Sequence, residues 1–222
     1  MPPATLVTGS HLARLARRRI RAAAAAAERC ELCAAPLADR HRHLVDPDSG
    51  EVGCVCRPCA LLFDRRQAAG GRRLLVPERA RRVADFSLDD GLWDDLAIPV
   101  GLAYFYACSR AGRVRAFYPG PMGATESLLG LEAWEELERE NPVLAALEPD
   151  VEALLVRRTG KEPVDPEYWI VPIDACYRLV ALMRTRWRGL GGGREVWQAI
   201  GDFFTELGGG AARVDRQGGR IP

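Results

Sequence analysis

Five of the seven cysteines lie within thirty residues, and their spacing indicates metal chemistry. Cys30 and Cys33 form one Cys-x-x-Cys pair, and Cys56 and Cys59 form a second. Each pair places two thiols on one side of a tight loop, and two such loops brought together form a tetrahedral site of four sulfurs. The sequence therefore predicts a metal site with these four cysteines as ligands and Cys54 as an alternative ligand.

A set of four sulfurs suits zinc, or iron in a rubredoxin-like site. Four thiolates leave no coordination position for a substrate, so zinc here would stabilise structure, whereas iron would transfer single electrons. Structural zinc ribbons are the commoner use of this pattern, so zinc is favoured and iron is the alternative. His41 and His43 are candidate substitute ligands, although a surface or hairpin position is the simpler interpretation of both.

The cysteines require a compact module that brings the two pairs together, and residues 29–66 are expected to form it as a zinc ribbon or rubredoxin-like knuckle module. Residues 43–45 and 51–55 have strand composition, and the sequence DPDSG between them is typical of a turn. A hairpin at this point returns the second pair of cysteines to the first. Cys54 and Cys56 are two residues apart, so on one strand both would face the same side.

The rest of the chain predicts a mixed α+β domain over residues 72–207, preceded by a tail with a basic helix and followed by a flexible tail over 208–222. Residues 117–127 are expected to form a loop, and Asp174 is expected to cap a helix. The predicted helices span 88–96, 131–140, 174–187 and 195–207, and the predicted strands span 73–76, 100–108, 113–118, 152–157 and 168–171.

The N-terminal segment 1–28 contains a predicted amphipathic helix whose basic side is a candidate partner-binding surface. Residues 1–86 hold sixteen arginines and nine acidic residues, a net charge of +7, but the whole chain carries only +1. This total does not indicate a general nucleic-acid binder, so a nucleic-acid-binding zinc ribbon stays a less favoured alternative. The basic side of the helix consists of Arg14, Arg17, Arg18 and Arg21.

The sequence favours a protein that is not an enzyme and is located in the cytoplasm. It has no run of about 18–20 apolar residues that could span a membrane, and the six alanines from Ala22 are too short for a secretion signal. Cysteines in a reducing compartment are ligands or buried thiols, and Cys108 and Cys176 are expected in the core. The three histidines all precede residue 44, and no phosphate-binding loop, metalloprotease or serine-hydrolase motif is present.

The chain contains the longer runs CELCAAPLADRHRHLVD, CVCRPCALLFDR, FYPGPMGATESLLGLEAWEEL, NPVLAALEPDVEALLV and WIVPIDACYRLVALMRTRWRGL. These runs resemble an actinobacterial family of unknown function. Its genes lie beside those of high-affinity uptake [NiFe]-hydrogenases. The resemblance implies a metal-binding accessory protein of a [NiFe]-hydrogenase system, acting in assembly, partner docking or regulation, with a hydrogenase subunit or maturation factor as its partner. Ala34 stands where such modules commonly have glycine.

Overall fold

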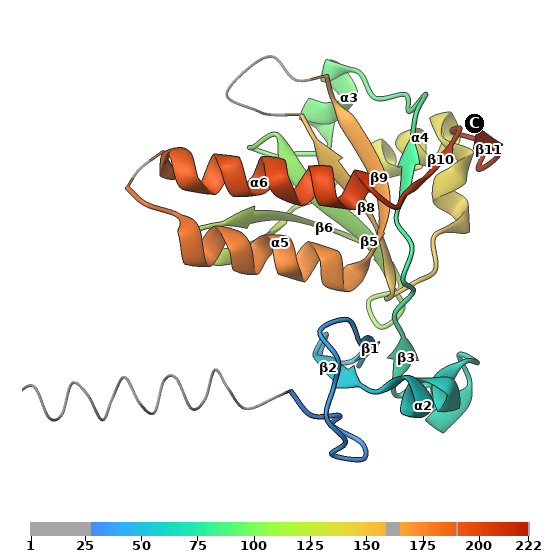
Figure 1. Ribbon diagram of the computed structural model, residues 1–222. Helices are drawn as coiled ribbons and strands as arrows, with labels where there is room; N and C mark the ends of the chain where they lie inside the picture. Colours follow the sequence, from blue (N-terminus) through green and yellow to red (C-terminus); the bar gives the residue numbers. More distant parts are fainter. Residues whose placement is uncertain (1–27, 159–164, 190, 222) are drawn as a thin grey trace, which may run out of the picture.

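The computed structural model describes residues 28–158, 165–189 and 191–221, and these form a small N-terminal module and a larger α+β domain (Figure 1). A three-stranded sheet of order β2-β1-β3 organises the small module. An eight-stranded sheet of order β11-β10-β4-β9-β8-β5-β6-β7 organises the larger domain. The expected α+β class is confirmed. The arginines Arg14, Arg17, Arg18 and Arg21 of the predicted basic helix lie outside the described residues.

The small module is built on the predicted hairpin of β1 (Arg42–Val45) and β2 (Val52–Val55), which pair in antiparallel register. The turn forms because the Asp46 carboxylate accepts hydrogen bonds from the backbone N–H groups of Asp48 and Ser49. The short helix α2 (Arg57–Ala60) and the 3₁₀ turns η1 (Leu61–Phe63) and η2 (Ala68–Gly71) follow.

The module extends beyond residue 66, because β3 (Leu74–Leu75) pairs with β1 and not with the larger sheet. Val45, Leu74 and Val76 are buried in the same hydrophobic cluster as the helices of the larger domain. The Arg110 guanidinium also donates a hydrogen bond of 2.6 Å to the carbonyl oxygen of Asp48 in the hairpin turn. The small module is therefore packed against the larger domain.

Every pair of neighbouring strands in the larger sheet is antiparallel except β10 and β4. The central strands are buried on both faces, which explains why their sequences are continuous apolar runs without polar alternation. The strands are β4 (Arg81–Val83), β5 (Leu102–Cys108), β6 (Arg113–Gly120), β7 (Gly123–Ser127), β8 (Glu152–Arg157), β9 (Glu167–Pro172), β10 (Ala212–Val214) and β11 (Arg220–Ile221).

Helices cover both faces of this sheet. Figure 1 shows α5 (Ile173–Arg186) and α6 (Gly193–Gly208) side by side on one face. Alternate residues of β8 face the two layers: Ala153 and Leu155 belong to the cluster under α5 and α6, and Leu154 and Val156 belong to the opposite cluster. The opposite layer contains α3 (Asp90–Asp95), α4 (Leu131–Glu140) and the 3₁₀ turn η3 (Pro142–Ala146).

Three expectations differ from the structure. Residues 208–222 were expected to be a flexible tail, but β10 and β11 join the sheet because β10 finds its partner in the distant strand β4. Residues 117–127 form much of the β6–β7 hairpin instead of a loop. Asp174 does not cap α5, because the N-cap residue of this helix is Pro172. The Asp174 carboxylate accepts a hydrogen bond from His43 instead.

Candidate metal centre

The structure brings the sulfurs of Cys30, Cys33, Cys56 and Cys59 to within 4.8 Å of one another. The Sγ atoms of Cys33 and Cys56 are 3.7 Å apart, and all four cysteines are free thiols. A zinc ion bound tetrahedrally by thiolates at about 2.3 Å requires sulfurs separated by about 3.8 Å, whereas a disulfide requires about 2.05 Å. The donor set therefore fits a metal ion such as zinc, and it does not fit a pair of disulfides.

The first knuckle is closed by backbone hydrogen bonds. The N–H of Cys30 donates to the carbonyl oxygen of Ala35, and the N–H of Ala34 donates to the carbonyl oxygen of Cys30, both at 2.8 Å. To close the loop Ala34 adopts a left-handed conformation with a φ of 58°. Glycine enters this conformation with little steric cost, whereas alanine does not.

The second knuckle leads directly into α2. Cys56 is the N-cap residue of this helix, and its carbonyl oxygen accepts a hydrogen bond of 2.9 Å from the N–H of Ala60. Pro58 stands at the start of the helix, where its fixed φ favours the helical turn and its missing N–H costs nothing. This turn carries the Cys59 sulfur back toward Cys56 and the first knuckle.

The thiols of the centre affect one another's protonation. Burial raises the pKa of the Cys30 thiol, but backbone N–H groups of Cys56, Cys33 and Leu32 directed at its sulfur together lower that pKa to about 6. Hydrogen bonds with the thiols of Cys56 and Cys33 raise the pKa of Cys59 to about 12. One thiolate therefore resists the formation of others, and a divalent cation is what allows all four to ionise together.

Cys54 does not join this group. Its sulfur lies in a second group with ring nitrogens of His41 and His43. Cys54 and Cys56 are two residues apart, but their sulfurs belong to different groups: Cys54 stands opposite His43 in the hairpin, and Cys56 is the N-cap residue of α2. The two histidines are half-buried, so a plain surface position does not describe them. The predicted hairpin is the sequence signal that could have identified this second group, since its register places His43 opposite Cys54.

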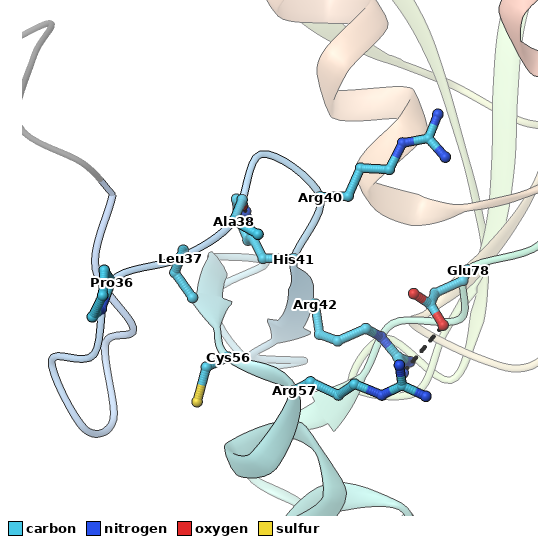
Figure 2. Close-up of a pocket in the computed structure, with 9 residues that line it drawn as sticks. All are labelled: Pro36, Leu37, Ala38, Arg40, His41, Arg42, Cys56, Arg57 and Glu78. Atoms are coloured by element: carbon cyan, nitrogen blue, oxygen red, sulfur yellow. Dashed lines mark hydrogen bonds and ion pairs between the residues drawn. The ribbon is translucent and has the colours of Figure 1, made fainter.

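A surface pocket of about 350 Å³ lies beside the centre (Figure 2). Cys56 lines it, and Figure 2 shows the Cys56 sulfur pointing away from the ion pair of Arg42 and Glu78, whose charged atoms are 3.3 Å apart. Arg40 and Arg57 also line the pocket and are exposed. The surface next to the candidate metal centre is therefore basic.

The other two cysteines, Cys108 and Cys176, are buried, as expected from the sequence. Cys108 lines a larger pocket of about 650 Å³ between the hairpin turn of the small module and the sheet, together with Tyr104, Tyr106 and Arg115. The sequence did not indicate this pocket, because residues from distant segments form it.

Among the described residues no helix combines the length and apolar character needed to cross a bilayer.

Comparison with known proteins assigns the chain to one protein family. Residues 29–211 match a family described as "Family of unknown function (DUF5947)". The match includes both knuckles and nearly all of the larger domain. No curated protein and no solved structure matches the chain.

Proposed function

Since the chain belongs to the DUF5947 family, whose function is unknown, we propose a function from its metal centre: a metal-stabilised accessory protein that docks onto a protein partner. The four cysteines hold one zinc ion, which fixes the small module in a shape that a partner recognises. The resemblance noted in the sequence suggests that this partner is a subunit or maturation factor of a cytoplasmic [NiFe]-hydrogenase system. This role covers assembly, docking or regulation of the hydrogenase.

The observation that carries the proposal is the closed set of four sulfurs within 4.8 Å of one another. Four protein thiolates complete the coordination of zinc, so the ion supports the fold and binds no substrate. The module has only a small core of its own, made of Cys30, Leu44, Val55 and Ala60. A core of this size stabilises a module only weakly, so a metal ion at the knuckles adds to the stability that packing against the larger domain provides.

Exposed apolar side chains around the centre support partner docking. Leu32 lies between the cysteines of the first knuckle and is 49% exposed; Leu61 and Leu62 follow the second knuckle and are 68% and 69% exposed. Leu61 and Leu62 line a shallow surface pocket together with Asp64 and Arg65. Exposed leucines beside charged side chains are typical of protein-binding surfaces. A partner with an apolar patch bordered by charged residues of both signs fits this surface.

Metal analysis of the protein purified from a host that makes the hydrogenase tests the metal part of the proposal. We expect a colourless protein with zinc in the four-cysteine centre. A red protein whose centre holds iron and no zinc would contradict the structural role, because it would indicate one-electron transfer through a rubredoxin-like site. Salt-sensitive retention of RNA or DNA would favour the nucleic-acid-binding alternative instead.

Affinity purification from the same host tests the partner. We expect hydrogenase subunits or maturation factors to co-purify with the chain, and we expect the double variant Leu61→Glu, Leu62→Glu to lose them while it retains its zinc. Leu128→Glu is the matched control, because Leu128 is 94% exposed and belongs to the larger domain. The docking proposal would be contradicted if the wild-type chain, the double variant and Leu128→Glu all recovered the hydrogenase proteins equally. It would also be contradicted if none of the three recovered them.

A further inference from the structure

A second group of metal-ligating side chains lies on the β1–β2 hairpin and the loop before it, next to the four-cysteine centre but separate from it. The Cys54 sulfur and one ring nitrogen each from His41 and His43 lie within 4.8 Å of one another. His43 stands directly opposite Cys54 in the antiparallel register. The two imidazole rings meet edge to face, with centroids 4.8 Å apart and planes at 79°. Residues from two strands therefore converge on one point.

Hydrogen bonds fix which nitrogen each ring can offer. Nδ1 of His43 lies 2.6 Å from a carboxylate oxygen of Asp174, and Nδ1 of His41 lies 3.0 Å from the carbonyl oxygen of Ala38. A carbonyl or carboxylate oxygen accepts hydrogen bonds, so Nδ1 is the donor in both rings and Nε2 keeps its lone pair. Histidines that bind metals are held in this way, with the second nitrogen donating to a carboxylate or carbonyl oxygen.

The side chain of His41 is only 10% exposed, and its Nε2 atom is buried with no hydrogen-bond partner among the described residues. A buried acceptor without a partner costs stability unless a ligand satisfies it. Figure 2 shows His41 beside Ala38, on the loop that leads into β1. The geometry of the loop therefore presents a nitrogen that a metal ion would satisfy.

Carboxylates also lie close to this group, although His41 lines a pocket together with Arg40 and Arg42. An oxygen of the Glu28 carboxylate lies 3.7 Å from His41 Nε2. A Glu31 carboxylate oxygen accepts a hydrogen bond of 2.8 Å from the backbone N–H of Cys54. With Asp174 behind His43, three carboxylates lie close to the group.

We propose that His41, His43 and Cys54 bind a second divalent metal ion of the zinc class, independently of the four-cysteine centre. Two imidazoles and one thiolate suit zinc and its neighbours in the first transition row. Three protein ligands leave a fourth position for an exchangeable ligand, and Glu28 borders that position. The four-cysteine centre stabilises the fold, whereas the second site binds metal more weakly and exchanges its fourth ligand.

The second site also links the metal to the contact between the two parts of the chain. Asp174 belongs to α5 of the larger domain, whereas His43 belongs to β1 of the small module. A metal ion on His43 makes its Nδ1–H a stronger donor, so metal binding strengthens the hydrogen bond to Asp174. Occupancy of the second site is therefore coupled to the packing of the module on α5.

Titration of the full, metal-free chain with Co²⁺ tests the proposal, because thiolate-to-cobalt charge-transfer absorption rises with the number of thiolate ligands. We expect two equivalents to bind. The second equivalent should add about a quarter of the charge-transfer absorption of the first, as expected for one thiolate against four. Saturation at a single equivalent would overturn the proposal, and this readout requires no variant.

Variants then identify the ligands. Cys54→Ser and His41→Asn should each abolish the second step and leave the first unchanged. Cys108→Ser is the matched control, because Cys108 belongs to neither group of ligands and its replacement should leave both steps unchanged. Asp174→Asn keeps every ligand and should weaken the second step about 10–100-fold, because it removes only the group that orients His43. Two equivalents retained by both Cys54→Ser and His41→Asn would show that these residues are not the ligands.

Discussion

Replacing Ala34 with glycine should make the protein more stable. Ala34 adopts the left-handed conformation, with a φ of 58°, in order to close the first knuckle. This conformation costs a residue with a Cβ atom roughly 1–2 kcal/mol. Glycine removes that cost but gives the unfolded chain more conformational freedom, which offsets about 0.4–1 kcal/mol. The expected net gain in the free energy of unfolding of the zinc-loaded protein is about 0.5–1 kcal/mol.

The gain should also tighten metal binding, because the metal ion holds the knuckle in its closed conformation. Where metal binding orders the knuckle, 0.5–1 kcal/mol corresponds to about 2–5-fold higher zinc affinity at the four-cysteine centre. Urea denaturation of the zinc-loaded protein measures the stability, and competition with a chelator measures the affinity. Both measurements are made on the wild-type chain and on Ala34→Gly.

A second alanine provides the control. Ala181 is an exposed residue within α5, where glycine is less favourable than alanine. Ala181→Gly should therefore lower the free energy of unfolding by about 0.5–1 kcal/mol, with no change in zinc affinity. The same chemical change then has opposite effects at the two positions. A loss of stability in Ala34→Gly equal to that in Ala181→Gly would refute the conformational reasoning.

Two further changes test the larger domain. Asn141 is fully buried; its amide donates hydrogen bonds to the carbonyl oxygens of Ser87 and Leu137 and accepts one from the Ser87 N–H. Asn141→Ala should lower the free energy of unfolding by about 2–4 kcal/mol in urea denaturation, and a loss below about 1 kcal/mol would contradict the assignment of these bonds. The pKa of Glu126 is lowered chiefly because Arg115 donates hydrogen bonds to its carboxylate. A lowered folded-state pKa contributes stability that is present above the ordinary value of about 4.3 and is lost as the pH falls through the folded value. Glu126→Gln should therefore cost up to about 1 kcal/mol at pH 6 and almost nothing at about pH 2 in urea denaturation, and a cost independent of pH would contradict this role.

Local signals in the sequence were sufficient for the β1–β2 hairpin and for the two knuckles. The turn at Asp46–Gly50 depends on hydrogen bonds between the Asp46 carboxylate and residues two and three positions later, so the composition of five residues predicts it. The Cys-x-x-Cys spacing likewise fixes each pair of sulfurs within one tight loop. Local chemistry therefore predicted both the four-cysteine group and the strands that bring its two halves together.

The features that the sequence did not reveal depend on contacts between distant segments. Asp174 has the composition of a helix cap, but the structure uses its carboxylate to hold His43, from a module far away in the chain. The strand β10 has only three residues and no periodic pattern, and it is ordered by its parallel pairing with β4. Cys54 belongs with His41 and His43 because the hairpin places it opposite His43, and the register of a hairpin depends on pairing between two strands.

X-ray absorption at the zinc edge tests the four-thiolate centre most directly. The measurement uses zinc-loaded Cys54→Ser protein, in which the second site is removed and the four-cysteine group is intact. We predict one zinc ion per chain, surrounded by four sulfur atoms at about 2.3 Å, with no nitrogen or oxygen neighbour. Zinc with fewer than four sulfur neighbours, or a protein that folds fully without retaining zinc, would contradict the assignment of this group as a structural metal centre.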